Sequence, residues 1–333
     1  MTEGKKKNMI WSVGIAFLFC CFLLPFTPQG SYSQNIRGGP GIQTFNLSVK
    51  GIERSYLIYV PASYNRQKPM PLVIMLHGGG GTGQAAMWET GWAEKAEKEG
   101  FIAAFPNAKA ANPEKPSHFS RNPQLWNDGS DRFYPGQAAP DDVGFLAAML
   151  DDLYARYPYD KGRVFITGFS NGASMSFLAA AKMPDRIAAI APVAGALWFD
   201  PPILKPPVPL CYITGTADPL NIIEGGVPRL ASGGSDRVRA KAKPPVKDSI
   251  LKWAKALECP EAPKISEENG VRTETYSPGQ EGSEVVYIAV EGLGHIWPGG
   301  RSLLPESMVG KTSKKIKANE VIWDFFKKHK RSP

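Results

Sequence analysis

The stretch Arg163-Val-Phe-Ile-Thr-Gly-Phe-Ser-Asn-Gly172 decides the fold of this chain. It runs from a β-branched, apolar segment through a serine flanked by glycines into a helical pattern. This is the Gly-x-Ser-x-Gly arrangement, in which a tight strand-to-helix turn lifts a serine hydroxyl above a sheet. Gly168 and Gly172 suit such a turn, because side chains would collide where strand and helix cross. The pentapeptide is short, so its meaning depends on the rest of the chain.

Apolar, β-rich runs alternate with helical patterns on both sides of this stretch. Strands are predicted at 56–60, 72–76, 101–105, 164–167, 188–193, 210–214 and 285–290. Helices are predicted at 84–99, 142–157, 171–183, 246–258 and 316–329. Several strands are apolar throughout, which is typical of parallel strands covered on both faces. The alternation predicts a doubly wound, mostly parallel α/β sheet in a single domain, with ligands at the carboxyl ends of its strands.

Two connections between these elements are unusually long. Residues 107–140 hold proline, asparagine, glycine and aromatic residues without a period, and residues 219–245 are rich in glycine, proline and basic residues. Connections of this length in a compact domain usually belong to a binding site. We therefore expect both to contribute to the site, with a mobile surface excursion as the alternative.

The first 33 residues have the pattern of a signal peptide. Three consecutive lysines precede an almost wholly apolar run over residues 9–26. Small residues then lead to a predicted cut between Ser33 and Gln34. The mature domain would cover residues 34–333 and would act outside the cytoplasm, either secreted or periplasmic. The apolar run is long enough that an uncleaved membrane anchor is the alternative.

Composition and charge narrow the possible partners and cofactors. The formal net charge is +8, and part of the excess lies near the C-terminus, where apolar residues at helical spacing indicate a packed helix with a solvated face. We therefore predict no nucleic-acid partner. The chain has four cysteines and four histidines without metal-ligand spacing, so neither a metal nor another cofactor is predicted. Cys211 and Cys259 follow the signal segment and could pair or remain separate thiols.

Ser170 needs two partners to act as a nucleophile: an imidazole to take its proton and a carboxylate to orient that imidazole. His295 is the candidate base, because it follows the last predicted strand on a glycine-flanked loop. Asp218 is the candidate acid, since it follows an apolar strand and lies between the serine and the histidine in the chain. Asp141 and Asp142 are rivals, but they precede the serine and open a helix, where acidic residues act as caps.

A glycine-rich segment, Leu76-His-Gly-Gly-Gly-Gly81, directly follows a predicted strand. Glycines let the backbone approach a substrate closely, so we predict that the amide of Gly79 forms part of an oxyanion hole. The amide of Asn171 is the second predicted donor, and His77 and Gly78 are expected at the substrate. A phosphate-binding loop is the alternative, but the glycines lack both a Lys-Ser/Thr ending and a Gly-x-Gly-x-x-Gly helix start.

Seven short motifs follow one another between about residue 45 and residue 300. They are Tyr59-Val-Pro-Ala62, His77-Gly-Gly79, Trp126-Asn-Asp-Gly129, Asp141-Asp-Val-Gly-Phe145, Gly168-Phe-Ser-Asn-Gly172, Gly215-Thr-Ala-Asp-Pro219 and Gly294-His-Ile-Trp-Pro-Gly299. Together they resemble the secreted polyhydroxybutyrate depolymerase and feruloyl esterase family of α/β-hydrolases. The resemblance implies a triad of Ser170, Asp218 and His295. It also implies that Trp126 and Trp297 flank the acyl or alcohol pocket, although both could instead be core aromatics.

These features predict a secreted serine esterase that cleaves carboxylic esters through an acyl-enzyme. The family that the chain resembles holds feruloyl esterases, acetyl xylan esterases and polyester depolymerases. A feruloyl or acetyl ester of a plant polysaccharide is the favoured substrate, because no linker or granule-binding module is evident after residue 300. A hydroxyalkanoate oligomer is the alternative substrate. A serine peptidase and a non-catalytic exported binding protein are alternatives of other classes, disfavoured because the expected site residues are present and a gating domain is not evident.

Overall fold

The computed structural model describes residues 39–110, 112, 114–119, 121–131, 139–228 and 241–331. Gly38–Pro333 forms one compact unit. The signal segment and its cut site, predicted above, lie outside the described residues. Within the described ranges, no helix is both long enough and apolar enough to cross a membrane.

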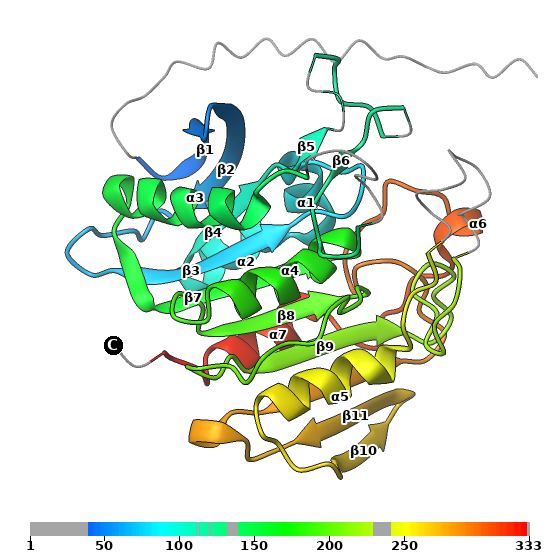
Figure 1. Cartoon of the computed structure of the whole chain (residues 1–333). Helices are drawn as coiled ribbons and strands as arrows, with labels where there is room; N and C mark the ends of the chain where they lie inside the picture. Colours follow the sequence, from blue (N-terminus) through cyan, green and yellow to red (C-terminus); the bar gives the residue numbers. More distant parts are fainter. Residues whose placement is uncertain are drawn as a thin grey trace, which may run out of the picture. The chain divides into compact units, whose positions relative to one another are not determined.

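One ten-stranded sheet forms the centre of the fold, in the order β1-β2-β4-β3-β7-β8-β9-β12-β11-β10 (Figure 1). Its six central strands run parallel to one another. These are β4 (Ile102–Pro106), β3 (Met70–Leu76), β7 (Tyr159–Phe169), β8 (Ala189–Val193), β9 (Leu210–Gly215) and β12 (Val285–Val290). The antiparallel edges are β1 (Gly41–Val49) with β2 (Ile52–Val60) and β11 (Val271–Tyr276) with β10 (Lys264–Glu268). The prediction of a doubly wound, mostly parallel sheet is confirmed.

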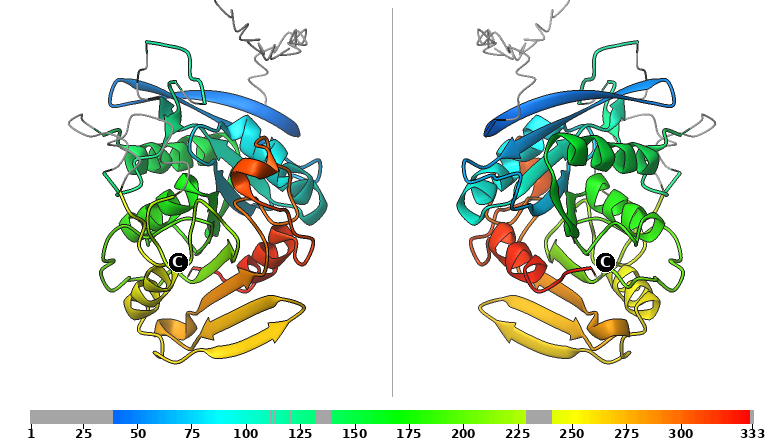
Figure 2. Two further views of the ribbon diagram at one scale, coloured as in Figure 1. Left: turned by 90° about the vertical axis from the view of Figure 1, so that its right-hand side faces the viewer. Right: turned by 90° about the vertical axis from the view of Figure 1, so that its left-hand side faces the viewer.

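Helices cover both faces of the sheet (Figure 2). One face carries α3 (Asp142–Arg156), α4 (Asn171–Lys182) and α5 (Val246–Ala256). The other face carries α1 (Gly83–Thr90), α2 (Trp92–Glu99) and α7 (Ala318–Phe326). Alternate residues of the central strands serve the two layers: Ile74 packs in the first core, whereas Val73 and Met75 pack in the second. This two-sided burial explains why the central strands are apolar throughout.

Shorter elements lie in the connections. The two-stranded ribbon of β5 (Lys109–Ala110) and β6 (Gln124–Leu125) belongs to the long segment after β4. The 3-10 helix η2 (Gln280–Gly282) precedes β12, and α6 (Glu306–Val309) lies between β12 and α7. The ribbon belongs to the part of this long segment that lies near the carboxyl ends of the central strands, where the candidate site is formed.

The sequence prediction misses the strands at both edges of the sheet. Every residue of β10 is exposed, so its sequence lacks the apolar signal on which strand prediction depends. The single helix predicted at 84–99 is instead α1 and α2, because Gly91 between them adopts a φ of 70° that ends the first helix. Cys211 and Cys259 are separate thiols, and burial raises the pKa of Cys211 to about 12.

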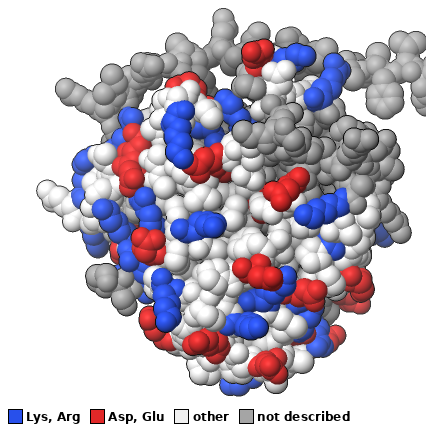
Figure 3. All heavy atoms as spheres, viewed as in Figure 1, with Lys and Arg blue, Asp and Glu red and all other residues white. Residues whose placement is uncertain are grey.

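On the face shown in Figure 3, basic and acidic side chains alternate over the described residues. Several form exposed pairs, such as Arg186 with Asp151 at 2.6 Å. Exposed pairs of this kind each contribute little to stability, so the fold depends mainly on the two apolar cores.

The C-terminal helix α7 packs on the sheet through one apolar face. Ile322 and Phe326 are fully buried, and the ring of Phe326 stacks on that of Phe165 in β7, with centroids 4.5 Å apart and planes 8° apart. Lys327 and Lys328 lie on the exposed side. The basic residues directly after the helix therefore lie in solvent, while the aromatic residues of the helix complete the second core.

We expect Phe326→Ala to lower the free energy of unfolding by about 3–5 kcal/mol, because it leaves a cavity against Phe165. Urea denaturation followed by circular dichroism measures this loss. The matched control is Lys328→Ala on the exposed side of the same segment, which should stay within about 0.5 kcal/mol of the wild type. Equal effects of the two substitutions would contradict the packing described for α7.

Candidate active site

Ser170 occupies the sharp turn between β7 and α4. Its backbone has φ of 54° and ψ of −115°, a conformation that non-glycine residues rarely adopt. The N–H of Ser170 donates to the carbonyl of Val193 at 2.9 Å, which ties the turn to β8. A Cβ at Gly168 would lie 2.4 Å from the carbonyl oxygen of Gly172, and one at Gly172 would lie 2.3 Å from that of Leu76. The two glycines are therefore required by the crossing of strand and helix.

The predicted acid and base meet at the same edge of the sheet. Asp218 follows β9 and His295 follows β12, and these strands are parallel neighbours. Nδ1 of His295 lies 2.7 Å from Oδ2 of Asp218. The other carboxylate oxygen of Asp218 accepts backbone N–H groups from Leu220 and Asn221, each at 2.7 Å. These two bonds fix the carboxylate, and the carboxylate orients the imidazole with Nδ1 toward it.

The surroundings of Asp218 favour its charged form. Burial by itself would raise the pKa of this carboxyl group. The charge of His295, its hydrogen bond and the two backbone N–H groups outweigh burial and hold the pKa of Asp218 below its ordinary value. Asp218 is therefore ionised near neutral pH and can stabilise a protonated imidazole.

His295 lies close to the serine turn. Its ring centroid is 4.7 Å from that of Phe169, the residue before Ser170. On the other side of the turn, a Cβ at Gly78 would lie 3.6 Å from the Cβ of Ser170, and one at Gly79 would lie 3.7 Å from that of Asn171. The structure thus brings the predicted base and both predicted oxyanion donors around the turn that carries the serine.

His77 is buried, and both of its ring nitrogens are used by the backbone. Nε2 accepts the N–H of Ala108 at 3.0 Å, so Nδ1 carries the proton and donates it to the carbonyl of Gly78 at 2.7 Å. Burial lowers the pKa of His77 to about 4, which keeps the ring neutral. These hydrogen bonds hold the glycine-rich segment in place. His77 also lines the cavity beside His295, so its place at the substrate stays a prediction.

The two tryptophans expected to flank the substrate differ in their positions. Trp126 has no exposed surface, and its Nε1 donates to the carbonyl of His77 at 3.0 Å. Trp126 therefore supports the glycine-rich segment instead of lining a pocket, which corrects the expectation. Trp297 is also nearly buried and donates from Nε1 to Oδ1 of Asn319 at 2.9 Å. It does line a cavity beside His295.

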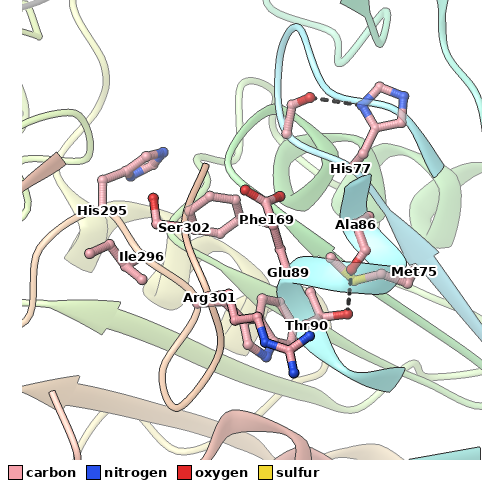
Figure 4. A pocket seen from close by; sticks show the side chains of 12 residues that line it. Met75, His77, Ala86, Glu89, Thr90, Phe169, His295, Ile296, Arg301 and Ser302 are labelled. Atoms are coloured by element: carbon pink, nitrogen blue, oxygen red, sulfur yellow. Dashed lines mark hydrogen bonds between the residues drawn. The ribbon is translucent and has the colours of Figure 1, made fainter. Parts of the chain in front are cut away.

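This cavity opens beside the imidazole of His295 (Figure 4). Phe169, Ile296 and Trp297 supply apolar walls, and Glu89 from α1 supplies a carboxyl group. Burial raises the pKa of Glu89, opposed by a hydrogen bond from a backbone N–H. The cavity therefore combines apolar surface with a carboxyl group that holds its proton more tightly than usual.

Sequence reasoning missed the contribution of Asp128. The side-chain amide of Asn171 donates to Oδ2 of Asp128 at 2.8 Å, and both side chains are buried. Asp128 lies in the Trp126-Asn-Asp-Gly129 motif, where the tryptophan alone had been singled out. Two adjacent polar residues inside an otherwise aperiodic connection were the available signal.

Within the described ranges, no group of three or more His, Cys, Asp or Glu residues could hold a metal ion.

Comparisons with known proteins show that this chain is similar to esterases. The family model for the esterase PHB depolymerase family matches residues 54–228. The chain is 30% identical over 297 residues to NocK of Nocardia uniformis subsp. tsuyamanensis, which carries a provisional esterase name, and the match covers 83% of this chain and 80% of that protein. It is 29% identical over 249 residues to feruloyl esterase B of Piromyces equi, covering 73% of this chain and 42% of that protein.

A shorter match and two solved structures complete these comparisons. The chain is 32% identical over 128 residues to poly(3-hydroxyalkanoate) depolymerase C of Paucimonas lemoignei, covering 38% of this chain and 28% of that protein. An acetyl xylan esterase from Aspergillus awamori superposes with a TM-score of 0.52 at 16% identity, covering 76% of this chain and 94% of that one. A thermostable esterase gives a TM-score of 0.54 at 16% identity, covering 87% and 63%. At this identity, the two structures support the fold.

The buried neutral state of His77 predicts a pH-dependent contribution to stability. Its pKa is about 4 in the folded chain against 6.5 for an unperturbed histidine. Between these values the unfolded chain binds a proton that the folded chain does not, so the stability linked to His77 is complete above pH 6.5 and falls toward pH 4. The full loss is about 3 kcal/mol.

Urea denaturation of the wild type and His77→Gln at pH 7 and pH 4.5 measures this contribution. Other groups titrate alike in both proteins, so the wild type should lose more stability than the variant between the two pH values. Equal losses in the two proteins would show that His77 is not held neutral in the folded chain.

Proposed function

The chain belongs to the esterase PHB depolymerase family and is a carboxylic-ester hydrolase, and on this premise we propose that Ser170, His295 and Asp218 form its catalytic triad. The observation that carries the proposal is the 2.7 Å contact between Nδ1 of His295 and Oδ2 of Asp218. With Nδ1 engaged, Nε2 of the same imidazole is the nitrogen left to accept a proton from the serine.

The proposed reaction has two halves that use the same groups. Oγ of Ser170 attacks the ester carbonyl carbon while His295 takes the hydroxyl proton, giving a tetrahedral intermediate. The amides of Gly79 and Asn171 donate to its oxyanion. The intermediate collapses as His295 gives the proton to the departing alcohol, which leaves an acyl-enzyme. Water then attacks the acyl-enzyme with His295 as base, releasing the acid and restoring the serine.

Asp218 has a defined task in this scheme. It fixes the tautomer in which Nδ1 of His295 carries a proton, and its negative charge stabilises the imidazolium that forms in both halves. The depressed pKa of Asp218 supports this task, because the carboxylate stays ionised when the imidazole becomes charged.

We propose a feruloyl or acetyl ester of a plant polysaccharide as the substrate. Feruloyl esterase B of Piromyces equi is among the relatives that match most of this chain. Phe169, Ile296 and Trp297 place apolar surface beside His295, and sites for small organic groups are lined mainly by such residues. A hydroxyalkanoate oligomer is the second candidate, supported by the match to poly(3-hydroxyalkanoate) depolymerase C.

We also propose that the enzyme acts outside the cytoplasm after removal of residues 1–33. The charged start, the apolar run and the small residues before Gln34 support this proposal. Mass spectrometry of the protein exported by its host would identify the first residue of the mature chain. A mature chain that begins at Gln34 supports the proposal, and an intact N-terminus in the membrane fraction supports an anchor instead.

Ser170→Ala should abolish ester hydrolysis, leaving at most a small residual rate from binding and the oxyanion hole. We would assay the variant and the wild type on p-nitrophenyl acetate, methyl ferulate, acetylated xylan and a hydroxybutyrate oligomer. The wild-type preference separates the acetyl, feruloyl and polyester substrates. A variant as active as the wild type would refute the role of Ser170.

Asp218→Asn should lower kcat by about 10³–10⁴-fold, because an asparagine can stabilise the wrong histidine tautomer and carries no charge. The measurement is kcat for p-nitrophenyl acetate together with the thermal midpoint, which reports that the variant is folded. A folded variant with undiminished kcat would remove Asp218 from the triad.

A further inference from the structure

Residues 124–128, called the clasp below, contact both halves of the proposed oxyanion hole. Toward the glycine-rich segment, the carbonyl of Gln124 accepts the N–H of Gly80 at 2.8 Å. On the same side, Nε1 of Trp126 donates to the carbonyl of His77 at 3.0 Å. These two bonds hold the backbone immediately before and after Gly78 and Gly79. The clasp thereby fixes the segment that carries the first oxyanion donor.

Toward the serine turn, the clasp binds the side chain of Asn171. The N–H of Trp126 donates to Oδ1 of Asn171 at 2.8 Å. Nδ2 of Asn171 donates to the carbonyl of Trp126 at 3.2 Å and to Oδ2 of Asp128 at 2.8 Å. Both ends of the amide are engaged, so its orientation is determined. The residue whose backbone amide is the second oxyanion donor is therefore anchored through its side chain.

Asp128 completes this network with its second oxygen. Its Oδ1 accepts from the N–H of Ser130 at 3.1 Å and from the Ser130 hydroxyl. Asp128 is 1% exposed, and Asn171 is 5% exposed. A buried carboxylate is costly unless its oxygens receive hydrogen bonds. Here Oδ2 receives a bond from Asn171, while Oδ1 is held within the turn that follows.

We propose that Asp128 is a positioning residue for ester hydrolysis. Through the side chain of Asn171 it holds the backbone amide of that residue in its donating orientation. The clasp then ties this donor to the segment of Gly79, so that the two donors keep a fixed separation. This inference rests on the proposed function, in which the two amides stabilise the oxyanion formed on attack by Ser170.

Such a role has a distinct kinetic consequence. Preorganised donors lower the barrier because they need no rearrangement when charge develops on the substrate oxygen. A donor that loses its anchor acts on the transition state more than on the bound ester, so kcat falls while KM stays nearly constant. A role in stability alone would change the unfolding free energy and leave kcat of the folded enzyme unaltered.

Asp128→Asn tests this prediction with little change in volume. One end of the asparagine amide is a donor, and it must face either Nδ2 of Asn171 or the N–H of Ser130, which are donors themselves. We expect kcat to fall roughly 10- to 100-fold, with KM within about twofold of the wild type. Affinity for a boronic acid, which adds to the serine as a tetrahedral mimic, should fall by a factor similar to that of kcat.

Asp160→Asn is the matched control. Asp160 is an acceptor in a local turn at the start of β7, opposite to the end that carries Ser170. Asp160→Asn makes the same chemical change as Asp128→Asn and should leave kcat and boronate affinity unaltered. If Asp128→Asn, folded by its thermal midpoint, also kept both values, the positioning role would be overturned.

An exchange of the two side chains covers the case in which Asp128→Asn does not fold. Asn171→Asp places two carboxylates face to face and should be severely impaired. The double variant combines Asn171→Asp with Asp128→Asn. In it, the asparagine at position 128 can donate to the aspartate at position 171 and still accept from Ser130. Recovery of kcat over Asn171→Asp supports the proposal, and a double variant no better than that single variant overturns it.

The outcomes also separate this inference from the proposed function. If Ser170→Ala kept wild-type activity, both the proposed triad and the positioning role of Asp128 would be refuted. If Ser170→Ala were inactive and Asp128→Asn behaved as the wild type, the positioning role alone would fall.

Discussion

The candidate site depends on the close crossing of β7 and α4 at Gly168 and Gly172. Neither position has room for a Cβ, because each would meet a backbone carbonyl at 2.3–2.4 Å. The crossing forces Ser170 into a backbone conformation with φ of 54°. Such conformations persist only where the surrounding structure determines them. Here β3 and β8, the parallel neighbours of β7, hold the strand on both sides.

Parallel topology then determines where the other groups meet. β9 and β12 leave their carboxyl ends at the same edge of the sheet as β7, so the loops that follow them bring Asp218 and His295 together. The charge and hydrogen bond of His295, together with the backbone N–H groups of Leu220 and Asn221, hold the pKa of the aspartate below its ordinary value in spite of its burial. Rigid strands thus position side chains that belong to irregular loops, which suits catalytic groups that require fixed geometry.

Buried hydrogen bonds around the glycine-rich segment fix the position of its backbone. His77 and Trp126 both carry polar ring atoms, and these atoms form hydrogen bonds with the backbone. Leaving such groups unpaired in the interior would be costly, so the network specifies one arrangement of the segment. The same principle applies to the buried pair Asn171 and Asp128.

The sequence by itself determined the fold class and the central strands, because continuous apolar runs and a Gly-x-Ser-x-Gly turn are local signals. It also indicated Ser170, Asp218 and His295, since their order and their positions after strands can be read along the chain. Exposed edge strands such as β10 escaped prediction, because their pairing depends on a neighbour and not on their own pattern. Only the tertiary structure decided that Trp126 is buried support and that Asp128 binds Asn171. Burial and hydrogen-bond partners depend on which distant segments meet, and an aperiodic connection carries no local signal of that meeting.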